Sequence, residues 1–106
     1  MISRWSEART VPCFQESVRR TLAVGERAMV CELRLPRGDA VPSHRHPYEQ
    51  VGYLVSGLLD FRIGDRRELV YPGDSWAIAS DVEHDVVAVE ESIAVDVFSP
   101  PRPDYL

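Results

Sequence analysis

Residues 38–57 read GDAVPSHRHPYEQVGYLVSG, and this stretch decides the fold that the sequence predicts. It places a histidine pair, His44 and His46, shortly before an apolar run at 51–55. Residues two apart on an extended strand face the same side, so both imidazoles can point into one site. Gln50 has the same even parity, and its amide oxygen can reach the same centre. The stretch therefore predicts β-structure with a polar site on one face.

The rest of the chain is interpreted as short extended segments separated by turn residues. Odd positions from 29 to 35 are apolar, and this period of two is typical of a half-buried strand. Turns are predicted at Ser56-Gly57 and Glu90-Glu91, among other places. Short strands with Gly, Pro and Asp between them favour an all-β sandwich or barrel. Besides the strand at 28–35, strands are predicted at residues 18–24, 51–55, 58–63, 68–71, 76–78, 86–89 and 92–98.

The length of 106 residues predicts one domain, residues 1–106. We place its core barrel at about residues 18–98, with an N-terminal segment and a proline-rich C-terminal tail packed on it. Three prolines within residues 99–104 exclude a central strand there, because proline cannot donate to the hydrogen-bond ladder.

The composition is that of a small acidic globular protein. Hydrophobic residues make up 44% and charged residues 27%, and the formal net charge is −5. This charge disfavours a nucleic-acid partner, which needs a basic face. No apolar run approaches the roughly 20 residues that cross a bilayer, and the first residues lack an apolar export segment. We therefore expect a cytoplasmic protein with no nucleic-acid or membrane partner, whose Cys13 and Cys31 stay reduced.

A third histidine extends the predicted site. His84 follows a short polar loop far along the chain, where a neighbouring strand can bring it beside the other two. Three neutral imidazoles and one oxygen suit one divalent transition metal with open positions. Nickel, zinc, iron, manganese, cobalt and copper all fit such a donor set. Parity favours Gln50 as the oxygen ligand, and Glu49 is the alternative, because Pro47 interrupts the strand and can reset its facing.

Two longer patterns carry a family resemblance. Residues 38–57, written Gly-x5-His-x-His-x3-Gln-x6-Gly, resemble the first motif of the cupins, where a glutamate usually stands in place of Gln50. Residues 73–84, written Gly-x5-Ala-x-Asp-x2-His, resemble the second motif, with Ala79 in place of proline and Asp81 in place of glycine. The resemblance implies a single-domain cupin, that is, a double-stranded β-helix or jelly-roll barrel, which holds a metal and forms homodimers. The metal ligands that it implies are His44, His46, Gln50 and His84.

A second resemblance concerns a narrower group. Segments 44–50 (HRHPYEQ) and 96–102 (DVFSPPR) are similar to those of small cupins of the pectin-degradation type, which open the ring of 4,5-unsaturated monouronates. The resemblance implies that Asp96 is a catalytic residue that moves a proton. It also implies that Arg102 binds the substrate carboxylate and assists catalysis, while Phe98 lines the substrate pocket. Asp96 and Phe98 are two apart on the last predicted strand and therefore face one side together.

The glutamine sets the expected chemistry. A neutral amide cancels none of the metal's charge, which favours Lewis-acid chemistry or anion binding over stabilisation of a higher oxidation state. We therefore predict a metal-dependent, non-redox enzyme that acts on a small sugar acid, by uronate ring opening or a related isomerisation. Two alternatives stay open. One is a metal-dependent dioxygenase, and the other is a non-catalytic cupin that binds or senses a small anion.

Overall fold

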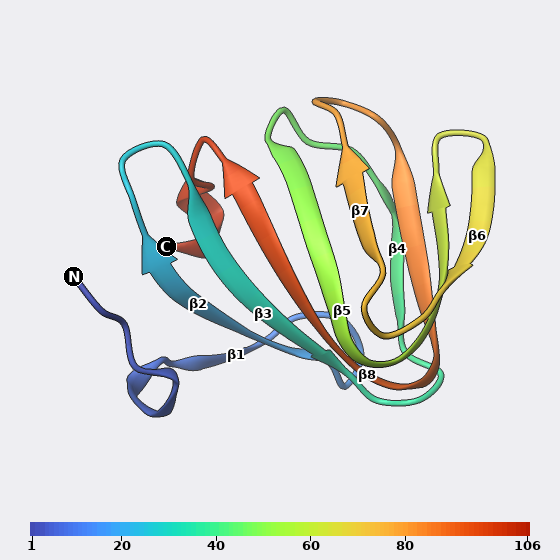
Figure 1. The fold of residues 1–106 in the computed structure, drawn as a ribbon, viewed down its shortest axis with the longest axis horizontal. Coiled ribbons are helices and arrows are strands. Elements are labelled where there is room, and N and C mark those ends of the chain that lie inside the picture. The colour runs from blue at the N-terminus through green and yellow to red at the C-terminus, as the bar shows by residue number, and fades with distance from the viewer.

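A computed structural model describes all 106 residues, Met1–Leu106, as an all-β barrel (Figure 1). It contains eight strands and two single-turn 3-10 helices, so the predicted all-β class is confirmed. In chain order the elements are η1 (Trp5–Glu7), β1 (Thr10–Pro12), β2 (Val18–Val24), β3 (Met29–Leu35), β4 (Ala40–His44), β5 (Glu49–Ile63), β6 (Arg66–Val70), β7 (Ser75–Ile78), β8 (His84–Ser99) and η2 (Pro103–Tyr105).

Two long strands organise the barrel. β5 and β8, of 15 and 16 residues, pair with each other in antiparallel fashion along most of their length. The first part of β5 pairs with β7 and its second part with β6. The first part of β8 pairs with β4 and its second part with β3, beyond which β2 and β1 extend the sheet. Each long strand therefore belongs to both walls of the barrel, and both bend at the lower edge of Figure 1.

Two of the predicted turns are wrong. The chain does not reverse at Ser56-Gly57 or at Glu90-Glu91, because β5 and β8 run through these positions. The pairing register between them shifts at several points from Leu54 to Leu59, so β-bulges bend the strands without ending them. The residues interpreted as turns mark instead the corner where both strands pass from one wall of the barrel to the other.

This corner is closely packed around a glycine. Gly57 has a φ of +100°, and a Cβ there would overlap Ser92 Oγ and the carbonyl oxygen of Glu91. Ser92 is fully buried, and its hydroxyl accepts a hydrogen bond from Leu58 N at 3.1 Å and donates one to Glu90 O at 2.8 Å. The bend thus requires glycine at residue 57 of β5 and a small polar side chain, that of Ser92, on β8.

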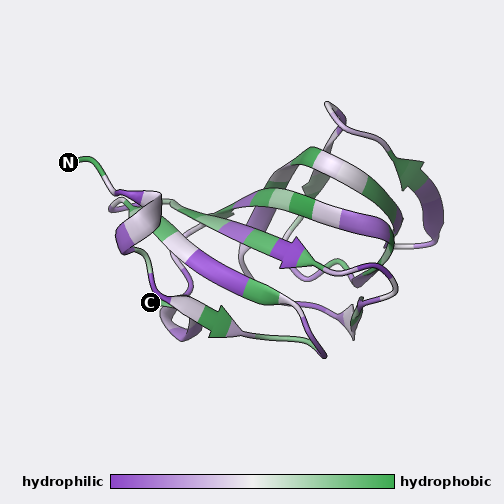
Figure 2. Ribbon diagram, turned by 90° about the horizontal axis from the view of Figure 1, so that it is seen from below, coloured by the Kyte–Doolittle hydropathy of each residue, from purple (hydrophilic) through white to green (hydrophobic).

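The barrel encloses one main apolar core. Buried residues alternate with more exposed ones along β7 and much of β5 and β8, and Figure 2 shows hydrophobic and hydrophilic residues alternating along the ribbons. A separate small cluster of Met29, Cys31 and Phe98 packs against Tyr48 and Tyr105, so the C-terminal tail lies against the last strand. The main core consists of Leu35, Val41, Leu54, Leu59, Phe61, Val70, Trp76, Ile78, Val86, Ala88 and Ala94.

Three further features bear on the sequence analysis. β1 pairs with β2 ahead of residue 18, where we placed the start of the core barrel. Cys13 and Cys31 are both free thiols. None of the helices is long and apolar enough to cross a membrane.

Candidate metal centre

The three histidines meet at one end of β4 and β8. His44 is the last residue of β4 and lies directly opposite His84, the first residue of β8. His46 follows β4 in the loop before β5, and it shares the inward facing of His44, as predicted, while Arg45 between them is exposed. Their ring centroids are 4.2 to 5.5 Å apart, and one ligand nitrogen from each lies within 4.8 Å of the others.

Each imidazole is held in one orientation by its own backbone. Every Nδ1 lies within hydrogen-bond distance of a main-chain carbonyl oxygen two residues away. Because a carbonyl only accepts, Nδ1 carries the hydrogen and Nε2 presents a free lone pair, as a metal ligand must. The three Nδ1–O pairs are His44 with Pro42 at 2.8 Å, His46 with Tyr48 at 2.9 Å and His84 with Val82 at 2.9 Å.

Burial favours the neutral form of His46 and His84. Loss of water contact lowers the pKa of His46, and the nearby positive charge of Arg102 lowers it further. Burial lowers the pKa of His84 to about 4, with smaller contributions from His44 and His46. Neutral imidazole is the form that binds metals, so the site is prepared for a cation near neutral pH.

Two features of this centre, an unpartnered nitrogen and a contact between two acceptor atoms, would be explained by a bound cation. The Nε2 atom of His84 is buried and has no hydrogen-bond partner. Gln50 donates from Nε2 to Asp96 Oδ1 at 2.9 Å, which turns its Oε1 toward His46 Nε2 at 3.1 Å. With His46 neutral and protonated on Nδ1, that contact brings two lone pairs together. A metal ion among these atoms would satisfy all of them, so the residues fit a divalent transition metal.

The two candidate oxygen ligands lie on opposite faces of β5. Gln50 points inward and is 7% exposed, whereas Glu49 is exposed. Pro47 lies in the loop before β5 and leaves the facing of the strand unchanged. The geometry therefore favours Gln50 as the fourth ligand.

Asp96 lies directly behind Gln50. Its Oδ1 accepts hydrogen bonds from Gln50 Nε2 and from Trp76 Nε1, both at 2.9 Å. Burial raises the pKa of this carboxyl group to about 6, although both hydrogen bonds oppose the rise. Phe98 points to the same inner side, and its ring lies 5.7 Å from that of His46.

Trp76 is not among the residues predicted to form the site, yet its indole donates a hydrogen bond to Asp96. Trp76 on β7, Gly52 on β5 and Asp96 on β8 form one register row across three strands. The indole passes over Gly52, where any Cβ would overlap its ring, and so reaches the carboxylate. A glycine within a strand often marks such a close approach, and this signal was present in the sequence.

Replacing Gly52 by alanine should displace the Trp76 indole from Asp96. The added methyl group forces the ring away, at an expected cost of about 1–3 kcal/mol in the free energy of unfolding. The measurement is the indole N–H signal of Trp76 in a ¹H–¹⁵N spectrum, which should move. The signal of Trp5, whose indole donates to Glu32, is the internal control. An unmoved Trp76 signal would contradict the assigned packing.

The C-terminal tail brings a cation to the same cavity. Arg102 follows β8, and its guanidinium lies 3.8 Å from the ring centroid of Tyr105 and 4.9 Å from that of Phe98. Its fork pairs with Asp104 at 2.8 Å, and only 11% of its side chain is exposed. The polar and site residues that line one shared cavity include His44, Gln50, His84, Asp96, Phe98 and Arg102.

Comparison with known proteins agrees with this architecture. The chain is 31% identical over 80 residues to the pectin degradation protein KdgF of Dickeya dadantii (strain 3937). The matched region covers 74% of this chain and 72% of the relative. The structure of KdgF from Halomonas sp. superposes with a TM-score of 0.93 at 26% identity, covering 100% of this chain and 98% of the other.

A second solved structure shows the fold alone. An RmlC-like cupin from Shewanella frigidimarina NCIMB 400 matches with a TM-score of 0.94 at 24% identity, covering 99% of this chain and 95% of the other. The family model described as "Cupin domain" matches residues 31–99, which is well over half of the chain. The chain therefore belongs to the cupin domain family and resembles its pectin-degradation members.

Proposed function

We propose that this protein is a metal-dependent enzyme that opens the ring of a small unsaturated uronate, or carries out a related isomerisation, without net redox change. The observation that carries the proposal is the buried carboxylate of Asp96, which Gln50 joins to the histidine site and which shares its cavity with Arg102. The similarity to KdgF, a protein named for pectin degradation, supports a sugar acid as the substrate class.

Four side chains hold the metal in this proposal. They are His44, His46 and His84 through Nε2 and Gln50 through Oε1. None of these donor types brings a charge to a metal, so a divalent ion bound there would keep its full charge and would supply Lewis-acid chemistry toward a substrate oxygen. The carbonyl contacts at each Nδ1 hold the rings in place before substrate arrives.

Asp96 moves the proton. Its Oδ1 is engaged by Gln50 and Trp76, while Oδ2 has no hydrogen bond within the chain. In ring opening, the carboxylate takes the proton of the hydroxyl group at the hemiacetal carbon, and the bond from that carbon to the ring oxygen breaks as the aldehyde forms. The ring oxygen then receives the proton and becomes an enol, so the reaction is an isomerisation that needs no co-reactant.

Arg102 and Phe98 place the substrate. The guanidinium fork matches a carboxylate in geometry and charge, and Arg102 lies beside Phe98 as one of two arginines, with Arg19, that line the cavity. Stacking on Tyr105 fixes the guanidinium plane. Its Nε and Nη2 donate to Asp104, so a substrate carboxylate would replace Asp104 or bind at Nη1. Phe98 supplies an apolar wall between the arginine and His46.

Replacing Asp96 by asparagine should lower kcat for uronate ring opening by at least about 100-fold, the lower range for loss of a general acid–base group. Asparagine keeps an oxygen for the bonds from Gln50 and Trp76, so the variant should fold and retain metal. The measurement is loss of the unsaturated uronate, followed by ultraviolet absorbance or NMR, in metal-loaded wild type and variant.

The control is Glu49→Gln, which changes an exposed carboxylate on the opposite face of β5 and should leave turnover unchanged. Undiminished turnover by Asp96→Asn would refute the proton-transfer role. Oxygen consumption by the metal-loaded wild type would favour a dioxygenase. Tight binding of the uronate without product would favour a binding or sensing protein.

A further inference from the structure

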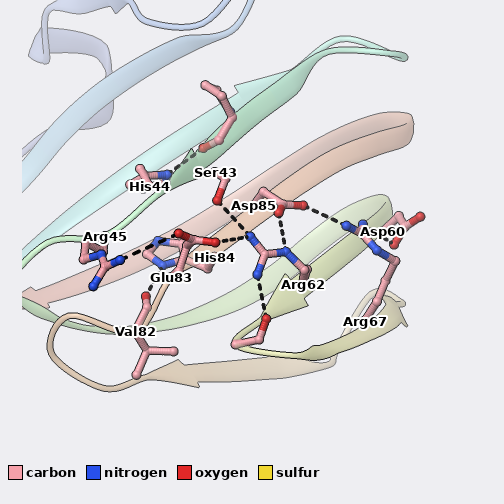
Figure 3. Close-up of polar contacts among 12 residues, drawn as sticks. Ser43, His44, Arg45, Asp60, Arg62, Arg67, Val82, Glu83, His84 and Asp85 are labelled. Carbon is pink, nitrogen blue, oxygen red and sulfur yellow. Dashed lines mark hydrogen bonds and ion pairs between the residues drawn. The ribbon is translucent and has the colours of Figure 1, made fainter.

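Arg62 on β5 joins the segments that carry two of the three histidines. Its Nε lies 2.6 Å from Asp85 Oδ2, and its Nη2 lies 2.8 Å from Ser43 Oγ and 3.0 Å from Glu83 Oε1 (Figure 3). Its Nη1 donates to the Gly64 carbonyl at 2.6 Å. The side-chain partners are immediate neighbours of histidines, because residue 43 precedes His44 and residues 83 and 85 flank His84.

Backbone pairing holds His84 on both sides, because Ile63 of β5 and His44 of β4 both pair with it, but it holds β4 on one side only. β4 pairs only with β8, and the register between them shifts between Val41 and His44. Arg62 of β5 pairs with Asp85 of β8 in the backbone register, and its side chain adds a bond to Asp85 and a link across β8 to Ser43 on β4. The link spans the histidine pair whose ring centroids are 4.2 Å apart.

We propose that Arg62 is a positioning residue that holds His44 and His84 at the spacing needed to share one metal ion. The proposal rests on the metal site of the proposed function but assigns Arg62 no contact with metal or substrate. Only an arginine can make this link, because its planar fork offers five donors at fixed angles, whereas a lysine offers one flexible point charge. Its side chain is 22% exposed and that of Asp85 18%, so water screens this ion pair only in part, whereas the bonds to Ser43 and Glu83 are exposed.

Arg67 provides a matched comparison. It lies on β6 and pairs with Asp60 at 3.1 Å and with the other oxygen of Asp85 at 3.1 Å. It makes no contact with Ser43 or Glu83, so it does not reach β4. Replacing either arginine by methionine removes one positive charge near His84, but only the change at Arg62 breaks the link between the two ligand-bearing strands.

The direction of the change in metal affinity distinguishes a loss of positioning from a loss of positive charge. Removal of a cation near a metal site raises metal affinity by itself, because Asp85 loses a positive neighbour and attracts the metal more strongly. Loss of positioning lowers the affinity. A weaker site in Arg62→Met therefore cannot come from the altered charge.

The experiment measures Co²⁺ binding to the metal-free full-length chain, by competition with a chromophoric chelator and by the visible absorption of bound Co²⁺. We expect Arg62→Met to bind Co²⁺ 10- to 100-fold more weakly than wild type, with an altered absorption band, as is typical when a contact that orients a ligand is lost. Arg67→Met should stay within threefold of wild type or bind more tightly. Wild-type affinity and spectrum in Arg62→Met would overturn the proposal.

Two further measurements keep the test decisive. If Arg62→Met does not fold, Ser43→Ala removes only the contact on β4 and should still weaken Co²⁺ binding measurably; unchanged binding overturns the proposal. The imidazole ¹⁵N signals of metal-free protein test the positioning without metal. Displaced His44 and His84 signals beside an unmoved His46 signal support it, and three unmoved signals overturn it. Wild type that binds no Co²⁺ would refute the proposed function, and these signals would still decide the role of Arg62.

Discussion

Replacing His84 by alanine should lower the affinity for a divalent transition metal by at least about 100-fold, more than is typical for loss of an outer-shell contact. His84 has the only imidazole Nε2 that is buried without a partner, and it lies opposite His44 across the strand pair. Its removal leaves a donor set of two imidazoles and an amide oxygen. Elemental analysis of protein purified without a histidine tag, followed by chelator competition, measures the change.

Thermal unfolding gives an independent readout of the same prediction. A metal at 100 times its Kd stabilises the folded state by about 2.7 kcal/mol, so a chelator should lower the Tm of wild type. It should leave the Tm of His84→Ala unchanged. Gln50→Ala should also weaken binding, whereas the matched control Glu49→Ala, on the exposed face, should not. Metal retained by His84→Ala at wild-type affinity would contradict the site, and loss in Glu49→Ala alone would reverse the choice of oxygen ligand.

Replacing Gly57 by alanine should lower the free energy of unfolding by about 2–6 kcal/mol. The methyl group would be forced against Ser92 Oγ and the Glu91 carbonyl, at a backbone φ of +100° that side-chain-bearing residues avoid. The estimate adds about 1–3 kcal/mol for the strained backbone to about 1–3 kcal/mol for overpacking. Because domains of this size are stable by about 5–15 kcal/mol, such a loss threatens folding itself. Urea unfolding followed by circular dichroism measures it.

Gly73→Ala is the matched control for this prediction. Gly73 has a similar φ of +93°, but nothing lies within 4 Å of a Cβ built on it. Gly73→Ala should therefore lower the free energy of unfolding only by the backbone part of that estimate, about 1–3 kcal/mol. Equal losses in the two variants would show that the corner at Gly57 tolerates a side chain, and that the bend of β5 does not depend on the close contact with β8.

The sequence predicted most of the local structure because a strand in a small barrel has one buried face. The apolar period of two located β3 at residues 29–35 and placed Asp96 and Phe98 on one face. The same parity placed Gln50 inside and Glu49 outside, since β5 begins only after Pro47.

Predictions from the sequence were wrong where the same residue types are common in two kinds of local structure. Gly57 and the pair Glu90-Glu91 are typical of chain reversals, but here they lie in the bulged corner shared by β5 and β8. A turn and a bulge call for similar residues, and only pairing with a distant strand separates them.

By itself, then, the sequence determined the all-β class, the inward-facing residues and the three histidines, because side-chain alternation and residue chemistry are local properties. Tertiary structure decided how distant residues combine. It placed Trp76 over Gly52 against Asp96, aligned His44 with His84, and linked Ser43 to Asp85 through Arg62. These contacts join residues from different strands, and their distances follow from sheet register and strand bending, which no local pattern in the chain specifies.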